Sequence, residues 1–166
     1  MLGYAKNFKG KNMKFIFGLI IGVLATALAG WFSMPSMMLK EYQSPFDINK
    51  TVQTIAKNAK ANGWVVPGIG KLHKSIKKHG GYDLTPVYLV NLCNASHAYN
   101  ILKKDNHKII ATMMPCTISV YEKADGKTYI GTMNAGLLGK MFGGDIAQIF
   151  GVEVAEDQQK FIEFAK

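Results

Sequence analysis

Twenty consecutive residues without a charge, residues 15–34, constrain the fold of this chain more than any other stretch. Their sequence, FIFGLIIGVLATALAGWFSM, is long enough to cross a bilayer as a helix, because such a helix needs about 20 apolar residues. Trp31 and Phe32 lie near one end, where interfacial aromatic residues are expected. We therefore predict a transmembrane anchor over residues 15–34, preceded by a basic tail over residues 1–14.

The charges that flank this anchor predict its orientation. Residues 1–14 contain four lysines and no acidic residue, and lysine-rich flanks mark the cytoplasmic side of a membrane. We therefore expect a single-pass protein of the bacterial inner membrane, with a cytoplasmic N-terminus and a periplasmic domain. A cleaved signal peptide is the alternative, because Ala27-Leu28-Ala29 resembles a cleavage site. The retained anchor is favoured because apolar residues continue beyond that point.

Length and charge limit what the rest of the chain can be. With 166 residues in total, the chain has room for one compact domain beyond the anchor. All 20 basic residues are lysine, and the net charge of +9 includes +4 from the first 34 residues. The domain is therefore only mildly basic, and it lacks arginine, which reads phosphates and base edges through bidentate contacts. We expect no nucleic-acid partner.

The spacing of apolar residues beyond the anchor predicts an α+β fold. Residues 35–45, which begin and end with proline, are interpreted as a linker, and residues 46–166 as the domain. Helices are expected over residues 46–62, 71–79 and 95–104, with two more in 134–166, and strands over 64–66, 87–92, 116–123 and 127–133. This order predicts a small, mostly antiparallel sheet packed against helices, preceded by one transmembrane helix.

Local signals support three of these boundaries. Asp47 or Asn49 can cap the first helix of the domain, and Asn94 can cap the third, because their side chains accept hydrogen bonds from free backbone N–H groups. Asp125-Gly126 is typical of a tight hairpin turn between two strands.

Several short motifs in the domain follow one another in a characteristic order. Thr51 lies in the first helix, Gly63-Trp64 leads into a strand, Cys93-Asn94 closes a strand, and Pro115-Cys116 opens the strand that continues into Val120-Tyr121-Glu122. In this order and spacing, residues 46–164 resemble the domain of unknown function family numbered 302. The usual Cys-Asn-Pro corner of that family is Cys93-Asn94-Ala95 here, so the rigid helix start that proline would give is missing.

This resemblance implies a compact α+β domain that often pairs as a dimer. It implies no established activity, although members sometimes occur in bacteria with sulfur or respiratory chemistry. We therefore predict a membrane-anchored, extracytoplasmic accessory or binding module without catalytic activity, which acts as a homo-oligomer or within a membrane complex. No cofactor is expected for this function.

Cys93 and Cys116 are the two cysteines of the chain. A disulfide, a pair of free thiols, and a pair of ligands or reactive thiols are all compatible with the sequence. A disulfide requires the loop over residues 105–115 to return the chain to the end of the sheet where Cys93 lies. We take Cys93, Asn94, His97 and Cys116 as the candidates for a ligand or thiol site.

The alternative function is a redox protein that binds copper or haem. Cys93, His97, Met113, Met114 and Cys116 would form a soft set of ligands at one corner of the domain. Covalent attachment of a c-type haem is excluded, because the chain has no C-x-x-C-H motif. Spacing alone also allows a Cys93–His97 nucleophile and base, but we assign no catalytic residue.

The apolar segment that includes Leu137, Leu138, Met141 and Phe142 is the last candidate for a functional surface. It is interpreted as a helix that covers the core, or as a dimer face, a lid over an apolar pocket or a face for lipid. Glycines at positions 139, 143 and 144 interrupt it. Because glycine lowers helix propensity by about 1 kcal/mol, they predict either mobility or close packing against a partner.

Overall fold

The computed structural model describes residues 6–165. The chain forms two compact units, which divide between Met37 and Met38. Residues 1–5 of the predicted basic tail lie outside the described residues, and residues 6–14 of that tail form the start of the first helix.

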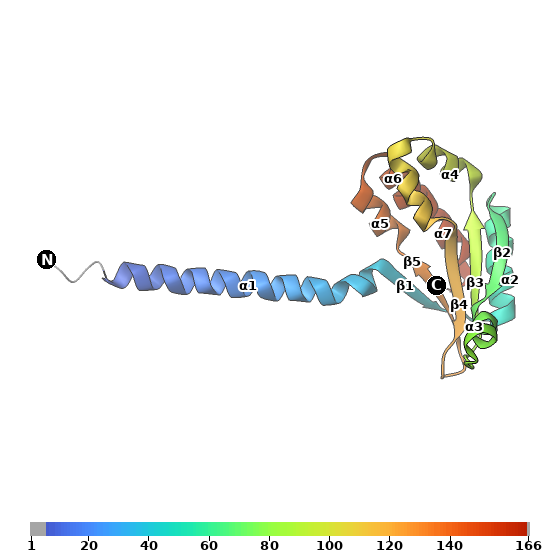
Figure 1. The fold of residues 1–166 in the computed structure, drawn as a ribbon, viewed down its shortest axis with the longest axis horizontal. Helices are drawn as coiled ribbons and strands as arrows, with labels where there is room; N and C mark the ends of the chain where they lie inside the picture. Colours follow the sequence, from blue (N-terminus) through green and yellow to red (C-terminus); the bar gives the residue numbers. More distant parts are fainter. Residues whose placement is uncertain (1–5, 166) are drawn as a thin grey trace. The chain divides into compact units, whose positions relative to one another are not determined.

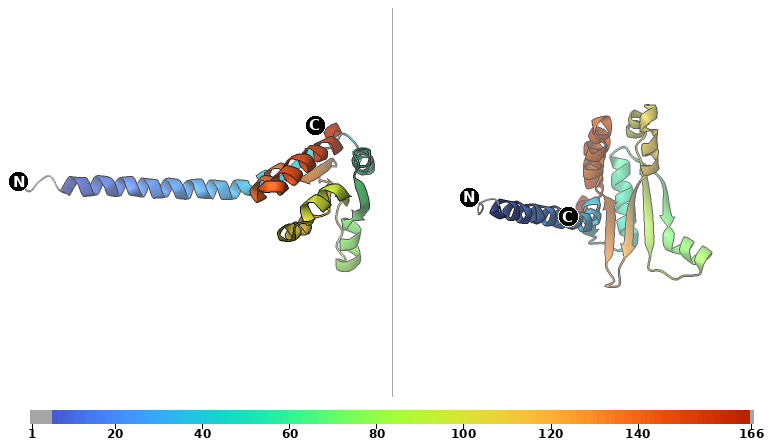
Figure 2. Two further views of the ribbon diagram at one scale, coloured as in Figure 1. Left: turned by 90° about the horizontal axis from the view of Figure 1, so that it is seen from above. Right: turned by 60° about the vertical axis from the view of Figure 1, so that its left-hand side comes forward.

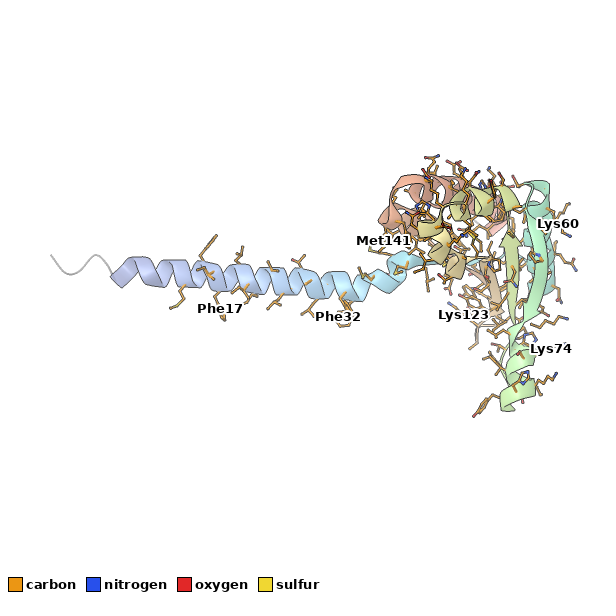
Figure 3. The ribbon with its side chains drawn as sticks, turned by 45° about the horizontal axis from the view of Figure 1, so that its top comes forward. Phe17, Phe32, Lys60, Lys74, Lys123 and Met141 are labelled. Carbon is orange, nitrogen blue, oxygen red and sulfur yellow. The ribbon has the colours of Figure 1, made fainter. Side chains whose placement is uncertain are left out.

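Helix α1 (Lys6–Met38) forms the first unit and its boundary with the second. Its window Phe15–Phe32 is long and apolar enough to span a membrane, and none of these residues is buried. Phe17 and Phe32 point away from the helix axis, with 67% and 79% of their surface exposed (Figure 3). The sequence prediction of an apolar helix of membrane-spanning length is therefore confirmed.

The second unit is built on one five-stranded antiparallel sheet, which confirms the predicted α+β class. Its strands are β1 (Leu39–Gln43), β2 (Val65–Lys71), β3 (Val87–Cys93), β4 (Cys116–Glu122) and β5 (Thr128–Met133). They lie in the order β1-β5-β4-β3-β2, and every neighbouring pair is antiparallel (Figure 1).

Strand β1 corrects the interpretation of residues 35–45 as a linker. Helix α1 continues through Pro35, and Leu39–Gln43 then pairs with β5, with Leu39 opposite Met133. This strand was missed because an edge strand with an exposed face can be almost entirely polar, so LKEYQ shows no apolar alternation. The pairing covers an edge of β5 that would otherwise leave its backbone groups open.

Helix α2 packs against β2, β3 and β4 (Figure 2). The regular helices are α2 (Ile48–Ala61), α3 (Leu72–Gly80), α4 (Ala95–Leu102), α5 (Ala135–Phe142), α6 (Gly144–Gln148) and α7 (Ala155–Phe161). Two 3-10 helices, η1 (Asp105–Met113) and η3 (Glu163–Ala165), and one π-helix, η2 (Ile149–Val154), complete the unit. The core contains Val90, Leu92, Ile118, Val120 and Ile130 from the sheet, Ile55 and Ala59 from α2, and Phe150, Phe161 and Ile162 from the C-terminal third.

The predicted caps and turn are present. The Asp47 carboxylate accepts a hydrogen bond from Lys50 N at 3.0 Å, and Asn94 Oδ1 accepts from Ser96 N at 3.0 Å. Gly126, with a φ of 73°, closes the hairpin between β4 and β5. The two helices expected over residues 134–166 divide at Gly143. Helix α5 ends at Phe142, and α6, η2 and α7 then follow one another without a break from Gly144 to Phe161.

Gly139 is a point of close packing. A Cβ atom at this position would lie 2.3 Å from the backbone nitrogen of Gly151, so α5 and η2 cross with their backbones in contact. Gly143 and Gly144 have φ values of 70° and 53°, a region that side chains disfavour, and they form the turn after α5. Within the domain these glycines therefore form a close crossing and a tight turn, whereas their packing against a partner stays a prediction.

Candidate functional site

Cys93 and Cys116 lie at the same end of the sheet. Strand β3 ends at Cys93 and the adjacent antiparallel strand β4 begins at Cys116, which is opposite Leu92. Helix α4 and η1 connect the two strands, so the chain does return to the end from which it left. Both cysteines are free thiols in the structure.

A small cavity lies at this corner and is lined by both cysteines. Its volume is about 20 Å³, which is enough for the centre of one water molecule, since a bound water needs about 10–15 Å³ measured in this way. Its walls include the candidate residues Cys93, Asn94, His97, Met114 and Cys116, together with Trp64, Leu92 and Phe150. We call these residues the thiol corner.

Asn94 fixes the start of α4 and with it the position of His97. Its Oδ1 atom accepts hydrogen bonds from Ser96 N at 3.0 Å and from His97 N at 3.2 Å. These are free N–H groups of the first turn, so the asparagine acts as an N-cap without the proline that the family motif would place next. The role of Asn94 is therefore to orient the helix that carries His97.

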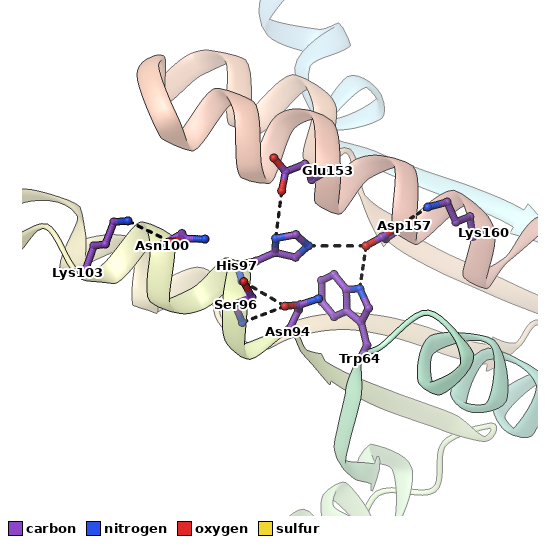
Figure 4. Close-up of polar contacts among 9 residues, drawn as sticks. All are labelled: Trp64, Asn94, Ser96, His97, Asn100, Lys103, Glu153, Asp157 and Lys160. Carbon is purple, nitrogen blue, oxygen red and sulfur yellow. Dashed lines mark hydrogen bonds and ion pairs between the residues drawn. The ribbon is translucent and has the colours of Figure 1, made fainter.

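The imidazole of His97 lies between two carboxylates (Figure 4). Its Nδ1 atom is 3.2 Å from Glu153 Oε2, and its Nε2 atom is 3.7 Å from Asp157 Oδ2. Glu153 and Asp157 are four residues apart at the junction of η2 and α7, so both can face the same histidine. His97 therefore joins α4 to the C-terminal helix.

Asp157 receives hydrogen bonds from two further side chains. Trp64 Nε1 donates to its Oδ2 at 3.0 Å, and Lys160 Nζ donates to its Oδ1 at 2.8 Å (Figure 4). Burial opposes ionisation of this carboxyl group, but the hydrogen bonds from Lys160 and Trp64 and the positive charge of Lys160 outweigh it, so its pKa lies below the usual value. The Trp64 ring also packs edge-on against Phe161, with centroids 5.4 Å apart.

The two thiols differ in their surroundings. Cys116 is 6% exposed, and this burial, together with the nearby Cys93, raises its pKa to about 11. Cys93 is only partly buried. Because the thiolate is the reactive form of cysteine, Cys116 is a protected thiol at neutral pH.

The copper or haem ligand set is assembled only in part. Cys93, His97, Met114 and Cys116 line one cavity, but Met113 lies outside this lining and packs against the core. Both ring nitrogens of His97 face carboxylates, and no three His, Cys, Asp or Glu side chains among residues 6–165 are placed to hold a metal ion. A pocket for a molecule of drug size has about 300–1,000 Å³, so a haem does not fit this cavity.

The predicted apolar face is smaller than expected. Met141 and Phe142 are 66% and 49% exposed, and Leu137 is partly buried. Leu138 is 7% exposed and belongs to the core. Its inclusion in a partner or lipid face is therefore wrong, because it lies on the side of α5 that packs inward.

Glu153, Asp157 and Lys160 were not identified as site residues from the sequence, and Trp64 was noted only as part of a family motif. They come from the segment before β2 and from η2 and α7, which are far apart along the chain. The one local signal is the spacing of Glu153, Asp157 and Lys160, which places them on one side of a helix. That spacing alone does not distinguish a histidine partner from a solvated surface.

The comparisons with known proteins agree with this fold. A family described as a domain of unknown function, DUF302, matches residues 40–165. The chain is similar to the crystal structure of an uncharacterised conserved DUF302 protein from Bacillus stearothermophilus, with a TM-score of 0.68 and 20% sequence identity over 78% of this chain and 99% of that chain. At this identity the similarity concerns the fold alone. No curated protein matches the chain.

Proposed function

This chain belongs to the DUF302 family, and from that premise we propose that it is a membrane-anchored binding or accessory module without catalytic activity, displayed on the extracytoplasmic side. The proposal has two parts. Helix α1 holds the protein in a membrane, and the folded domain recognises a partner or ligand there. The thiol corner is the proposed recognition site.

One observation carries the anchor. All 18 residues of the window Phe15–Phe32 are exposed, although they are apolar enough to span a bilayer. An apolar helix in a water-soluble protein normally buries one face against a core, and α1 as described offers its whole circumference to the surroundings. A lipid environment accounts for this exposure, because a spanning helix satisfies its own backbone and presents apolar side chains in every direction.

The charges near the anchor support its orientation. The lysines of the first 14 residues predict a cytoplasmic N-terminus, which would place the domain in the periplasm of a bacterial cell. The expected homodimer stays a prediction.

The thiol corner supports a binding role rather than a catalytic one. The side chains that would perform acid–base chemistry there are held by partners: His97 by Glu153, and Asp157 by Trp64 and by Lys160 of its own helix. The cavity is apolar apart from the edges of Asn94 and His97, and Cys93 lies partly exposed at its wall. Such a corner suits a small apolar group of a ligand or partner, which would fill the cavity in place of one water molecule.

Membrane integration is tested by a matched pair of full-length variants. Ile20→Lys together with Leu24→Lys adds two charges near the centre of the predicted span, each opposing insertion by about 3 kcal/mol. The control, Ile20→Val with Leu24→Val, keeps the span apolar. We expect the native chain and the control to resist extraction by alkaline carbonate, and the lysine variant to appear in the soluble fraction. Extraction of the native chain would refute the anchor.

A redox function is the second candidate, and one observation favours it. Sulfur-bearing side chains from Cys93, Met114 and Cys116 line the same cavity, and thiolate and thioether groups suit copper(I). The test is the copper content of protein purified from membranes, with Cys93→Ser compared with Met113→Leu as the control outside the cavity. One copper per chain that is lost only with Cys93→Ser would support this function, and metal-free native protein would refute it.

A further inference from the structure

Helix α5 begins beside the residue at which the folded unit starts. The backbone N–H of Asn134 donates to the carbonyl oxygen of Met38 at 2.8 Å. Asn134 is the N-cap of α5, and its Oδ1 also accepts from Leu137 N at 3.3 Å. The start of α5 is therefore held next to Met38, the residue at which the chain leaves α1.

An apolar surface extends from this point along α5. Asn134, Leu137 and Met141 are separated by three and four residues, so they lie on one side of the helix. Met141 is 66% exposed and lies at the surface of the folded unit (Figure 3), and Phe142 beside it is 49% exposed. A helix of eight residues is about 12 Å long, so this exposed pair lies close to Met38.

The first residues of the folded unit enlarge the same region. Met38 and Leu39 are 36% and 62% exposed, and Leu39 pairs with Met133, the residue before Asn134. We call Met38, Leu39, Leu137, Met141 and Phe142 the apolar foot. Lys140 is the one charged residue of α5 and is exposed within it.

The exposed end of α5 is fixed in position. Gly139 is in backbone contact with Gly151, Leu138 is buried in the core, and Gly143 turns the chain immediately after Phe142. Large apolar side chains that are held outward on a fixed element mark an interaction surface. Segments that lie at the boundary between lipid headgroups and acyl chains also combine exposed apolar residues with lysine.

From these observations we infer that the apolar foot is a second membrane contact, which rests on the surface of the leaflet from which α1 emerges. This inference rests on the proposed function, because it needs α1 to be in a bilayer. The apolar foot contacts the phospholipid bilayer rather than another protein. The reason is length: the last six residues of α1, 33–38, add only about 9 Å of helix beyond the apolar window. The bilayer is therefore within reach of a surface that starts at Met38.

The contact would also restrict how the domain is presented. One spanning helix leaves a domain free to tilt, whereas a second contact about 12 Å from the point of attachment limits that tilt. The face of the domain that carries the thiol corner would then keep one orientation relative to the membrane.

The test is depth-dependent quenching of a fluorophore on the full-length chain in phosphatidylcholine–phosphatidylglycerol vesicles. Met141→Cys in a Cys93→Ser, Cys116→Ser background receives an environment-sensitive dye, and nitroxide-labelled lipids act as quenchers. Ala124→Cys, in the exposed hairpin between β4 and β5 at the other end of the sheet, is the matched control. We expect quenching at position 141 to exceed that at position 124 by at least about twofold, because the foot would reach the headgroup–acyl boundary.

Vesicle flotation separates failure of the inference from failure of the proposed function. Protein that floats with the vesicles but shows equal quenching at the two positions would overturn the inference alone. A blue-shifted dye at position 141 that lipid nitroxides do not quench would mean that a protein covers the foot, which also overturns the inference. Protein that does not float would refute the anchor, and the inference with it.

A second measurement avoids the cysteine substitutions, in case they impair folding. A phosphatidylcholine that carries a diazirine on its acyl chain is photolysed in vesicles that contain the unmodified chain. Adducts are expected in the peptide that contains residues 137–142 as well as in the anchor. Adducts confined to the anchor would overturn the inference.

Discussion

The indole N–H of Trp64 donates to the Asp157 carboxylate at 3.0 Å, across 93 positions of the sequence. This bond connects the residue before β2 with α7, and Asp157 is also 3.7 Å from His97 at the start of α4. The thiol corner is therefore held by side chains from three elements that are distant in sequence. Its geometry depends on the folded domain as a whole rather than on a local motif.

Removal of the Trp64 donor should destabilise the domain. Trp64→Phe keeps an aromatic ring against Phe161 but leaves Asp157 without one of its hydrogen bonds, and a bond to a charged group contributes about 1.5–3 kcal/mol. We expect a loss of that size in the free energy of unfolding, measured by urea denaturation in detergent. Tyr99→Phe, at a position that is 68% exposed, is the control and should change this energy by less than about 0.5 kcal/mol. Equal effects of the two substitutions would contradict the assigned bond.

The lowered pKa of Asp157 predicts a pH dependence of stability. The folded state binds fewer protons at this group than the unfolded state, whose pKa is about 3.9, so the carboxylate stabilises the fold above that pH. This contribution is lost as the pH falls through the lower pKa of the folded state. The stability difference between the native chain and Asp157→Asn should therefore be largest near pH 6 and shrink towards pH 3. A difference that stays constant over this range would contradict the shift.

Gly139 and Gly136 provide a matched pair on α5. Gly139→Ala would place a Cβ atom 2.3 Å from Gly151 N, whereas the nearest atom to a Cβ at Gly136 is 3.5 Å away, an ordinary contact. We expect Gly139→Ala to lower the melting temperature strongly, because two backbones would have to separate. Gly136→Ala should be neutral or stabilising by up to about 1 kcal/mol, since alanine favours helix. A stable Gly139→Ala variant would mean that α5 and η2 do not cross at this distance.

The two thiols should differ in reactivity. With a pKa of about 11, only about one Cys116 side chain in a thousand is a thiolate at pH 8. We expect iodoacetamide to modify Cys93 first in the native protein and to modify Cys116 only after unfolding. Mass spectrometry of the alkylated peptides measures both rates, with Cys93→Ser and Cys116→Ser as reciprocal controls. No modification even in denaturant without reductant would show that the cysteines are bridged.

The sequence predicted those elements whose signals are local. Asp47 and Asn94 cap the helices expected of them, Asp125-Gly126 forms the hairpin, and the apolar window of α1 is helical. Each of these features depends on side chains within a few positions of one another. The order of strands and regular helices followed from them, apart from β1, while residues 105–113, expected to be a loop, form the 3-10 helix η1.

The features that the sequence did not predict depend on distant contacts. Strand β1 forms because its backbone pairs with the edge of β5, and the sequence of β1 does not itself indicate this pairing. Leu138 and Met141 look alike in sequence. Because α5 crosses η2 at Gly139, Leu138 lies on the buried side of the helix and Met141 on the exposed side. Asp157 contacts Trp64 and His97 of the thiol corner only because α7 packs beside the residue that precedes β2.

The most direct test of the proposed function is the side of the membrane on which the domain lies. A single cysteine at Ala124, in an exposed hairpin, is introduced into the Cys93→Ser, Cys116→Ser chain and expressed in bacterial cells. A membrane-impermeant maleimide is then added before or after lysis. We expect labelling in intact spheroplasts, and a Gly3→Cys control that is labelled only after lysis. Labelling of position 124 only after lysis would place the domain in the cytoplasm and contradict the proposed function.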